Sequence, residues 1–272
     1  MELLKQIPGS RPAGILGKRL YRVGATAALA AALLFRRNLD AEFLLLRGAG
    51  FLHTGPGEPP STVLDWFTLL QNNKLLALTL LNLFDLVNYT LVGLIFLSLF
   101  VALVRANQSW MVIALALGLA GIIVYIASNQ ALTMLSLSNQ YLAATTDLQR
   151  EKFLSAGQVV LAIHLNNSYG GSGIYLSFLL VSVAGLIIST VMLRSNIFSK
   201  ATAYIGILAN GFGLGYYPVL VFSPGLVFLP LSVSAIFLLV WYLLVGRRLW
   251  ALGSHLYDHN KEVWKCEQLP VG

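Results

Sequence analysis

One acidic residue, Asp85, lies well inside a long apolar segment of the chain, in the sequence LNLFDLVNY. A carboxylate deep in a bilayer costs about 2.5–3.5 kcal/mol on insertion scales, so it is expected to face other helices and to have a polar partner. Helical spacing predicts a polar stripe on the face that carries Asp85, made of Thr79, Asn82, Tyr89 and Gly93 with Asn88 on its flank. The stripe indicates a proton, ion or ligand site, or else a purely structural ion pair or hydrogen bond.

Arg36 and Arg37 are the natural partners of this carboxylate, because they follow the apolar run 23–35 at a compatible depth. A guanidinium offers a planar fork of donors to the two oxygens of an Asp, so a bidentate bond is possible. Two alternatives stay open. Both arginines can extend to the membrane surface, or Arg36 can pair with Asp40 one turn further along the same helix.

A second group of polar residues occupies the stretch 128–150, which is expected on the outer side of the membrane. Its amide, hydroxyl and guanidinium groups can form a pocket for a polar ligand. The candidate pocket residues are Asn129, Gln130, Gln140, Tyr141 and Arg150. The alternative is a water-exposed helix extension followed by a loop, which needs the same residue types.

The remaining chemistry-bearing residues do not form recognisable sites. His164 stands alone, and His255 and His259 lie in a polar tail without a clear third metal ligand. The single cysteine, Cys266, excludes an internal disulfide framework, and no nucleophile-elbow, zinc-protease or P-loop motif occurs. We therefore expect no catalytic residues, no metal site, no cofactor and no enzymatic activity.

The elements that must position these residues are set by the composition. Of the 272 residues, 57% are apolar and only 11% are charged, and the mean hydropathy is +0.75. Such a chain is neither disordered nor an ordinary soluble enzyme, and its main partner is the lipid bilayer. The net charge of +7 arises from basic residues beside apolar segments, so we expect no nucleic-acid binding.

The apolar runs predict an all-α, polytopic bundle of six transmembrane helices, with short interfacial or extramembrane helices between them. The expected spans are 20–46, 75–104, 110–141 (with its polar end projecting), 174–193, 201–222 and 226–245. We expect a tail at 1–19, a membrane domain at 20–248 and a second tail at 249–272.

Two capping boxes predict shorter helices. Thr62-Val-Leu-Asp65 precedes a segment rich in Trp, Phe and Leu, which suits a short interfacial helix. Thr146-Asp-Leu-Gln149 opens an amphipathic helix over 146–165, which is too short in apolar length to span and is expected to lie on the outer face.

Six spans put both termini on the same side of the membrane. With that topology, 12 Lys and Arg residues flank the terminal side and 6 flank the other side. The positive-inside rule then predicts cytoplasmic termini, with the loops 47–73 and 142–172 outside.

Several stretches taken together resemble a domain-of-unknown-function family of multi-pass bacterial membrane proteins. They are LLFRRNLDAE (33–42), LFDLVNY (83–89), SLSNQYLAATTDLQR (136–150), VMLRS (191–195) and GILAN (206–210). The resemblance covers most of residues 18–253 and implies a helical membrane bundle, but no activity. We expect the protein in the plasma (inner) membrane, with both termini cytoplasmic.

Two functions fit these features. The first is a membrane protein that binds or passes a small solute or a proton around Asp85. The second is a structural or regulatory subunit whose buried charges only fix helix packing. Paired acids and clustered histidines are absent from the predicted spans, which counts against an intramembrane enzyme.

Overall fold

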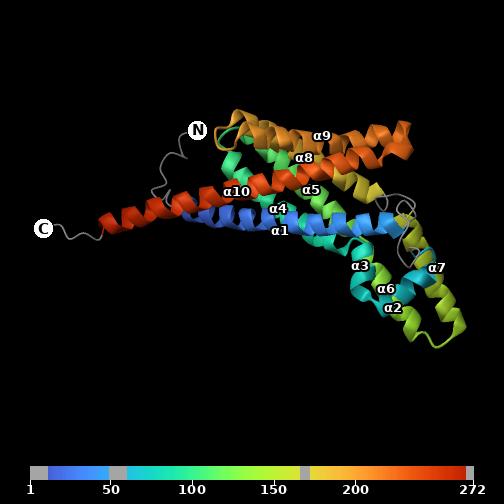
Figure 1. Ribbon diagram of the computed structural model, residues 1–272. Coiled ribbons are helices and arrows are strands. Elements are labelled where there is room, and N and C mark those ends of the chain that lie inside the picture. Colours follow the sequence, from blue (N-terminus) through green and yellow to red (C-terminus); the bar gives the residue numbers. More distant parts are fainter. Residues whose placement is uncertain (1–11, 49–59, 166–171, 268–272) are drawn as a thin grey trace, which may run out of the picture. The chain divides into compact units, whose positions relative to one another are not determined.

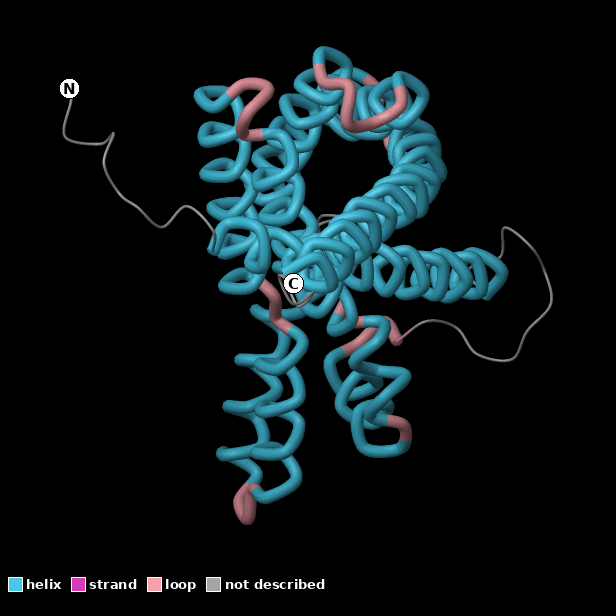
Figure 2. The backbone as a smooth tube through the Cα atoms, turned by 90° about the vertical axis from the view of Figure 1, so that its left-hand side faces the viewer, coloured by secondary structure: helices cyan, strands magenta, loops and turns pink. Residues whose placement is uncertain are grey.

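The computed structural model describes residues 12–48, 60–165 and 172–267, and the regular elements within these ranges are all helices (Figures 1 and 2). The expected all-α class is therefore confirmed for the part of the chain that is described. In chain order the elements are α1 (Pro12–Gly48), α2 (Val63–Asn72), α3 (Lys74–Leu80), α4 (Leu83–Leu103), α5 (Gln108–Ser128), α6 (Ala131–Ala143), α7 (Asp147–Leu165), α8 (Ser172–Arg194), α9 (Lys200–Phe222), the 3₁₀ turn η1 (Pro224–Leu226) and α10 (Phe228–Glu267).

Five helical segments within the described ranges are long and apolar enough to cross a membrane. They are Leu83–Leu103, Gln108–Ala143, Gly173–Arg194, Lys200–Phe222 and Pro224–Ser254. They correspond to the second to sixth spans expected from the sequence. α1 is not among them, because its uninterrupted apolar run, 23–35, reaches only about 20 Å. The chain thus has the helices of a multi-pass membrane protein.

Two of the expected spans are not continuous helices. The expected helix over 75–104 ends at Leu80 and restarts at Leu83, and the one over 110–141 is interrupted at Asn129 and Gln130. The second candidate span therefore begins at Leu83 and not at residue 75, whereas the third keeps its expected extent, Gln108–Ala143, with a two-residue interruption. The remaining pieces α4 and α5 have 21 residues each, about 31 Å, which matches the hydrocarbon core of a bilayer.

The chain divides into two compact units, which are described separately. The first contains, among the described residues, 12–32, 91–118 and 182–267. Its helices approach closely through small side chains: α1 buries Ala25, Ala28 and Ala31, and a Cβ on Gly246 of α10 would lie 3.2 Å from Ala28 Cβ. α9 and α10 run side by side (Figure 1). Close approach through small residues is typical of helix pairs in membranes.

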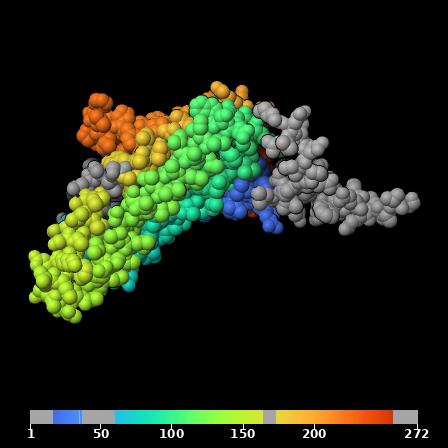
Figure 3. Space-filling model, turned by 180° about the vertical axis from the view of Figure 1, so that it is seen from behind, coloured from blue at the N-terminus to red at the C-terminus, as the bar shows by residue number. Residues whose placement is uncertain are grey.

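The second unit comprises 33–90 and 119–181 and contains what we call the four-helix cap, made of α2, α3, α6 and α7. These helices gather in Figure 1, and Figure 3 shows the side chains of α6 and α7 as one continuous surface, coloured yellow-green. The cap has its own apolar core: Val63, Trp66, Phe67, Leu70, Ala77, Leu81, Ala131, Met134 and Leu161. It is therefore a small packed body in its own right.

The first capping box is confirmed at the start of α2. The Asp65 amide donates to Thr62 Oγ1 over 3.2 Å, and the Thr62 amide donates to Asp65 Oδ2 over 3.0 Å. The Thr62 hydroxyl and then its amide, together with Ser61, hold the pKa of Asp65 below its usual value, because they stabilise the carboxylate. The negative charge also suits the N-terminus of a helix.

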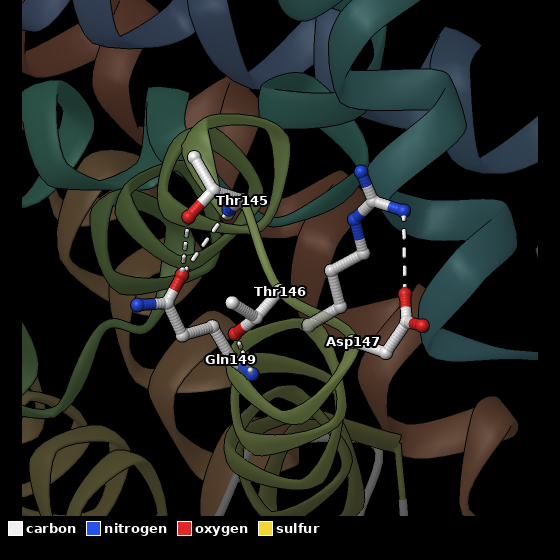
Figure 4. Close-up of polar contacts among 5 residues, drawn as sticks. Thr145, Thr146, Asp147 and Gln149 are labelled. Carbon is white, nitrogen blue, oxygen red and sulfur yellow. Dashed lines mark hydrogen bonds and ion pairs between the residues drawn. The ribbon is translucent and has the colours of Figure 1, made fainter.

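The second box begins α7 in a modified form (Figure 4). Thr146 Oγ1 accepts from the Gln149 amide over 3.3 Å, as expected. The Gln149 side chain, however, accepts from the amide of Thr145 over 3.1 Å rather than from that of Thr146. The helix over 146–165 is confirmed, and its apolar face lies on α2: a Cβ on Gly157 would come within 2.6 Å of Val63 Cγ1.

Candidate functional site

The first helix break, Leu81–Asn82, turns the chain between α3 and α4. Asn82 has a φ of 61°, in the left-handed region where Asn is among the few residues tolerated without a large cost. The Leu81 and Asn82 amides still bond to carbonyls in α3, and the Asp85 amide donates to Asn82 O over 3.2 Å. The break therefore changes the helix direction while keeping these backbone groups paired.

This break corrects the expected depth of Asp85. Asp85 was expected ten residues into a continuous span, but it lies in the first turn of α4. A carboxylate there is close to the end of the 21-residue span and interacts favourably with the helix dipole. In a bilayer that α4 crosses, a carboxylate at this end of the helix costs less than one at the centre.

The second helix break, Asn129–Gln130, is built around the side chain of Asn129. Its Oδ1 accepts from the Ala131 amide over 3.0 Å in an Asx turn, which satisfies one amide at the start of α6. Its Nδ2 donates to Asn82 O over 3.2 Å. One side chain thus ties the two helix breaks together, and Asn82 takes part through its backbone carbonyl.

Asp85 contacts α5 through Tyr125, one turn before the second break. The Tyr125 hydroxyl donates to Asp85 Oδ2 over 3.2 Å. The ring of Tyr125 also stacks on Tyr89, with centroids 3.8 Å apart and planes 7° from parallel. Tyr125 is buried, whereas Asp85 is partly exposed. We call Asn82, Asp85, Tyr89, Tyr125 and Asn129 the Asp85 site.

α8 packs closely on the C-terminal half of α5, and glycines allow this close contact. A Cβ on Gly173 would overlap Ser128 Oγ, and one on Gly121 would lie 2.9 Å from the Ser177 carbonyl. No larger residue fits either position without displacing a neighbour. This tight approach holds the segment of α5 that carries Tyr125.

The structure brings together three of the six residues predicted around Asp85, namely Asn82, Asp85 and Tyr89. Asn88 is buried one turn beyond Asp85, and its Oδ1 has no hydrogen-bond partner among the described residues. Arg36 is exposed, and the side chain of Arg37 lies outside the described residues. The pairing of Asp85 with either arginine stays a prediction.

The five residues of the expected outer pocket make contacts with other groups. Asn129 belongs to the Asp85 site, and Gln130 donates to Ser128 O over 3.3 Å. Gln140 donates to Ser136, the ring of Tyr141 lies 5.5 Å from that of Phe67, and Arg150 pairs with Asp147 at 3.7 Å. None of these contacts joins two of the five, and a pocket formed by them stays a prediction.

Tyr125 is the residue that sequence reasoning missed. In the run GIIVYIAS it resembles an ordinary aromatic core residue. The one usable signal was its spacing, because Tyr125, Ser128 and Asn129 recur on one helix face just where the segment becomes polar. No protein-family model matches the chain, and neither curated proteins nor solved structures gave a match.

Proposed function

We propose that this chain is a six-span membrane protein that binds or passes a small solute or a proton at the Asp85 site. The observation that carries the proposal is the bond from Tyr125 to Asp85 Oδ2 beside two linked helix breaks. Interrupted helices in membrane proteins expose backbone carbonyls and helix ends, and these commonly form solute and ion sites. A partly exposed carboxylate at such a place is suited to exchange a proton or to bind a hydrogen-bond donor.

This proposal counts α1 as a membrane-spanning helix in addition to the five candidate spans, which makes six. Its small residues pack on two helices that can themselves cross a membrane: Ser98 of α4 donates to Leu20 O over 2.9 Å, and Gly246 of α10 lies against Ala25 and Ala28. Arg36 lies 12 residues beyond Gly24, which touches Ser98, and Asp85 lies 13 residues before Ser98. Both are therefore about 20 Å along their helices from that contact, which supports an Arg partner for Asp85.

The orientation follows from the charges. With six spans, the 12-to-6 distribution of Lys and Arg favours cytoplasmic termini, and the resemblance to bacterial proteins favours the inner membrane. Cysteines introduced at Ser155 and at Ser195 test this topology. An impermeant thiol reagent applied to intact cells should label the first and not the second, and the opposite pattern contradicts it.

The experiment on function compares the purified wild-type chain with Asp85→Asn. Reconstituted vesicles report proton flux through an internal pH dye, and a thermal-shift screen of small polar solutes reports binding. We expect at least one of these signals in the wild type and its loss in Asp85→Asn. Asp65→Asn, which removes a carboxylate from the cap, is the matched control and should keep the signal.

A structural role is the second candidate, because Asp85, Tyr125, Asn129 and Asn82 satisfy one another's hydrogen bonds. In that case the wild type gives neither flux nor a ligand shift, and Asp85→Asn only lowers the melting temperature. That combination of results overturns the proposed function.

A further inference from the structure

Basic residues predominate in the segments of the first unit where side chains are described. Over 17–32, 91–118 and 182–254 the chain contains no Asp or Glu. It contains eight Lys and Arg residues, which we call the basic end: Lys18, Arg19, Arg22, Arg105, Arg194, Lys200, Arg247 and Arg248. An excess of positive charge of this size over the described segments attracts anions.

Contacts between helices bring several of these basic residues close together. Arg248 of α10 donates through Nε to the carbonyl of Ile197, in the turn that joins Arg194 at the end of α8 to Lys200 at the start of α9. Three helices thus contribute a cation to one turn. Further along α10, a Cβ on Gly253 would lie 3.1 Å from Arg22 Cγ, so the basic start of α1 adjoins the same end of α10.

The same helix ends carry exposed aromatic side chains. Trp250 is 52% exposed and follows Arg248, and Tyr204 is 57% exposed one turn after Lys200. Trp110, near Arg105, is 50% exposed. Trp and Tyr prefer the headgroup level of a bilayer, where the ring is in an apolar layer and its polar group is in water. Arg194, Lys200, Arg247 and Arg248 are also exposed.

We propose that the basic end binds the phosphate groups of anionic phospholipids, with Arg194, Lys200 and Arg248 as the central contact. A guanidinium pairs with two phosphate oxygens, and Arg248 uses only its Nε in holding the turn. The exposed rings of Trp250 and Tyr204 favour a lipid over a soluble phosphate, because only a lipid brings an acyl chain or headgroup that these rings can contact. This surface lies in the first unit and is independent of the Asp85 site.

The test measures lipid retained by the full-length protein in detergent after incubation with mixed micelles of phosphatidylglycerol and phosphatidylcholine. The variant R194Q/K200Q removes two cations and leaves Arg248 to hold the turn. The matched control K74Q/K152Q removes two exposed lysines from the cap. Inorganic phosphate and glycerol phosphate are assayed separately by thermal shift as soluble competitors.

We expect the wild type and K74Q/K152Q to retain phosphatidylglycerol preferentially, and R194Q/K200Q to bind it at least about tenfold more weakly. The preference should decrease as NaCl is raised, since the attraction is screened. Equal retention by the two double variants overturns the proposal. So does stabilisation by soluble phosphate as large as that by the lipid. Neither result bears on proton flux or solute binding at Asp85.

Discussion

The hydroxyl of Tyr125 donates a hydrogen bond to Asp85 Oδ2 over 3.2 Å and thereby joins α5 to the first turn of α4. The same ring stacks on Tyr89, which is one turn beyond Asp85 on α4. Tyr125 therefore fixes the carboxylate from one side by a polar contact and α4 by an apolar one. A mutation that removes one of these two contacts and keeps the other can show which of them stabilises the protein.

Tyr125→Phe removes the hydroxyl and keeps the ring stacked on Tyr89. We expect a loss of about 1.5–3 kcal/mol in unfolding free energy, because the bond is made to a carboxylate and its donor, Tyr125, is buried. Denaturant unfolding in detergent measures it. The exposed Tyr204 provides the control, since Tyr204→Phe should leave stability unchanged. Equal stability of all three proteins would contradict a role for the Tyr125 bond.

Asn82 is expected to act through its backbone and not through its side chain. Its φ of 61° favours glycine, and its carbonyl accepts from Asn129 and from the Asp85 amide. Asn82→Gly should therefore keep the fold and any activity of the site, whereas Asn82→Ala should cost about 1–2 kcal/mol through backbone strain. Thermal unfolding compares the two. A larger loss of thermal stability in Asn82→Gly than in Asn82→Ala would show that the positive φ of Asn82 does not determine the helix break.

Gly157 allows α7 to pack closely on α2. A Cβ there would lie 2.6 Å from Val63 Cγ1 and 3.0 Å from Phe67 Cζ, so Gly157→Ala should destabilise the cap by about 1–3 kcal/mol. A Cβ on Gly211 in α9 would have nothing within 4 Å of it, and Gly211→Ala is the control. Hydrogen exchange should accelerate in α2 and α7 only for the first variant. Unchanged exchange would mean that the contact relaxes without cost.

The start of α2 should depend on pH. The pKa of Asp65 is lowered in the folded protein, so its contribution is fully present above the unfolded-state pKa. That contribution is lost as the pH falls through the folded-state pKa. The protection factors of the amides in the first turn of α2, which are corrected for the intrinsic pH dependence of exchange, should therefore fall on acidification below the usual range for Asp. In Asp65→Asn this dependence should disappear, and its persistence would assign the effect to another group.

The helices themselves were largely predictable, because long apolar runs and the Thr62–Asp65 box are local signals. The helix breaks were not. Apolar periodicity continues across Leu81 and Asn82, and an Asn is tolerated in a helix. The break there is held by Asn129, which is 47 residues away along the chain. A hydrogen bond between residues so far apart in the sequence cannot be predicted from the local pattern of apolar residues.

The position of Gln149 shows the same limit on a smaller scale. The box motif correctly predicts the bond from Gln149 N–H to Thr146, because it depends on helix geometry alone. The return bond goes to Thr145 instead, because the backbone that precedes the helix decides which amide the side chain meets. Sequence spacing specifies the helix and not the path of the chain that enters it.

The core of the four-helix cap also sets an order of events during synthesis. Val63 and Phe67 are made before α4 and α5, whereas Met134 and Leu161 are made after them. The two halves of the core can meet only once the intervening α4–α5 hairpin has been completed. Until then the apolar side chains of α2 that pack on α6 and α7 are uncovered, although α3 is already present, and they are available to chaperones or proteases. Closure of the cap thus has to wait for α6 and α7, which follow the α4–α5 hairpin, and a chain that stalls within that hairpin keeps this part of α2 uncovered.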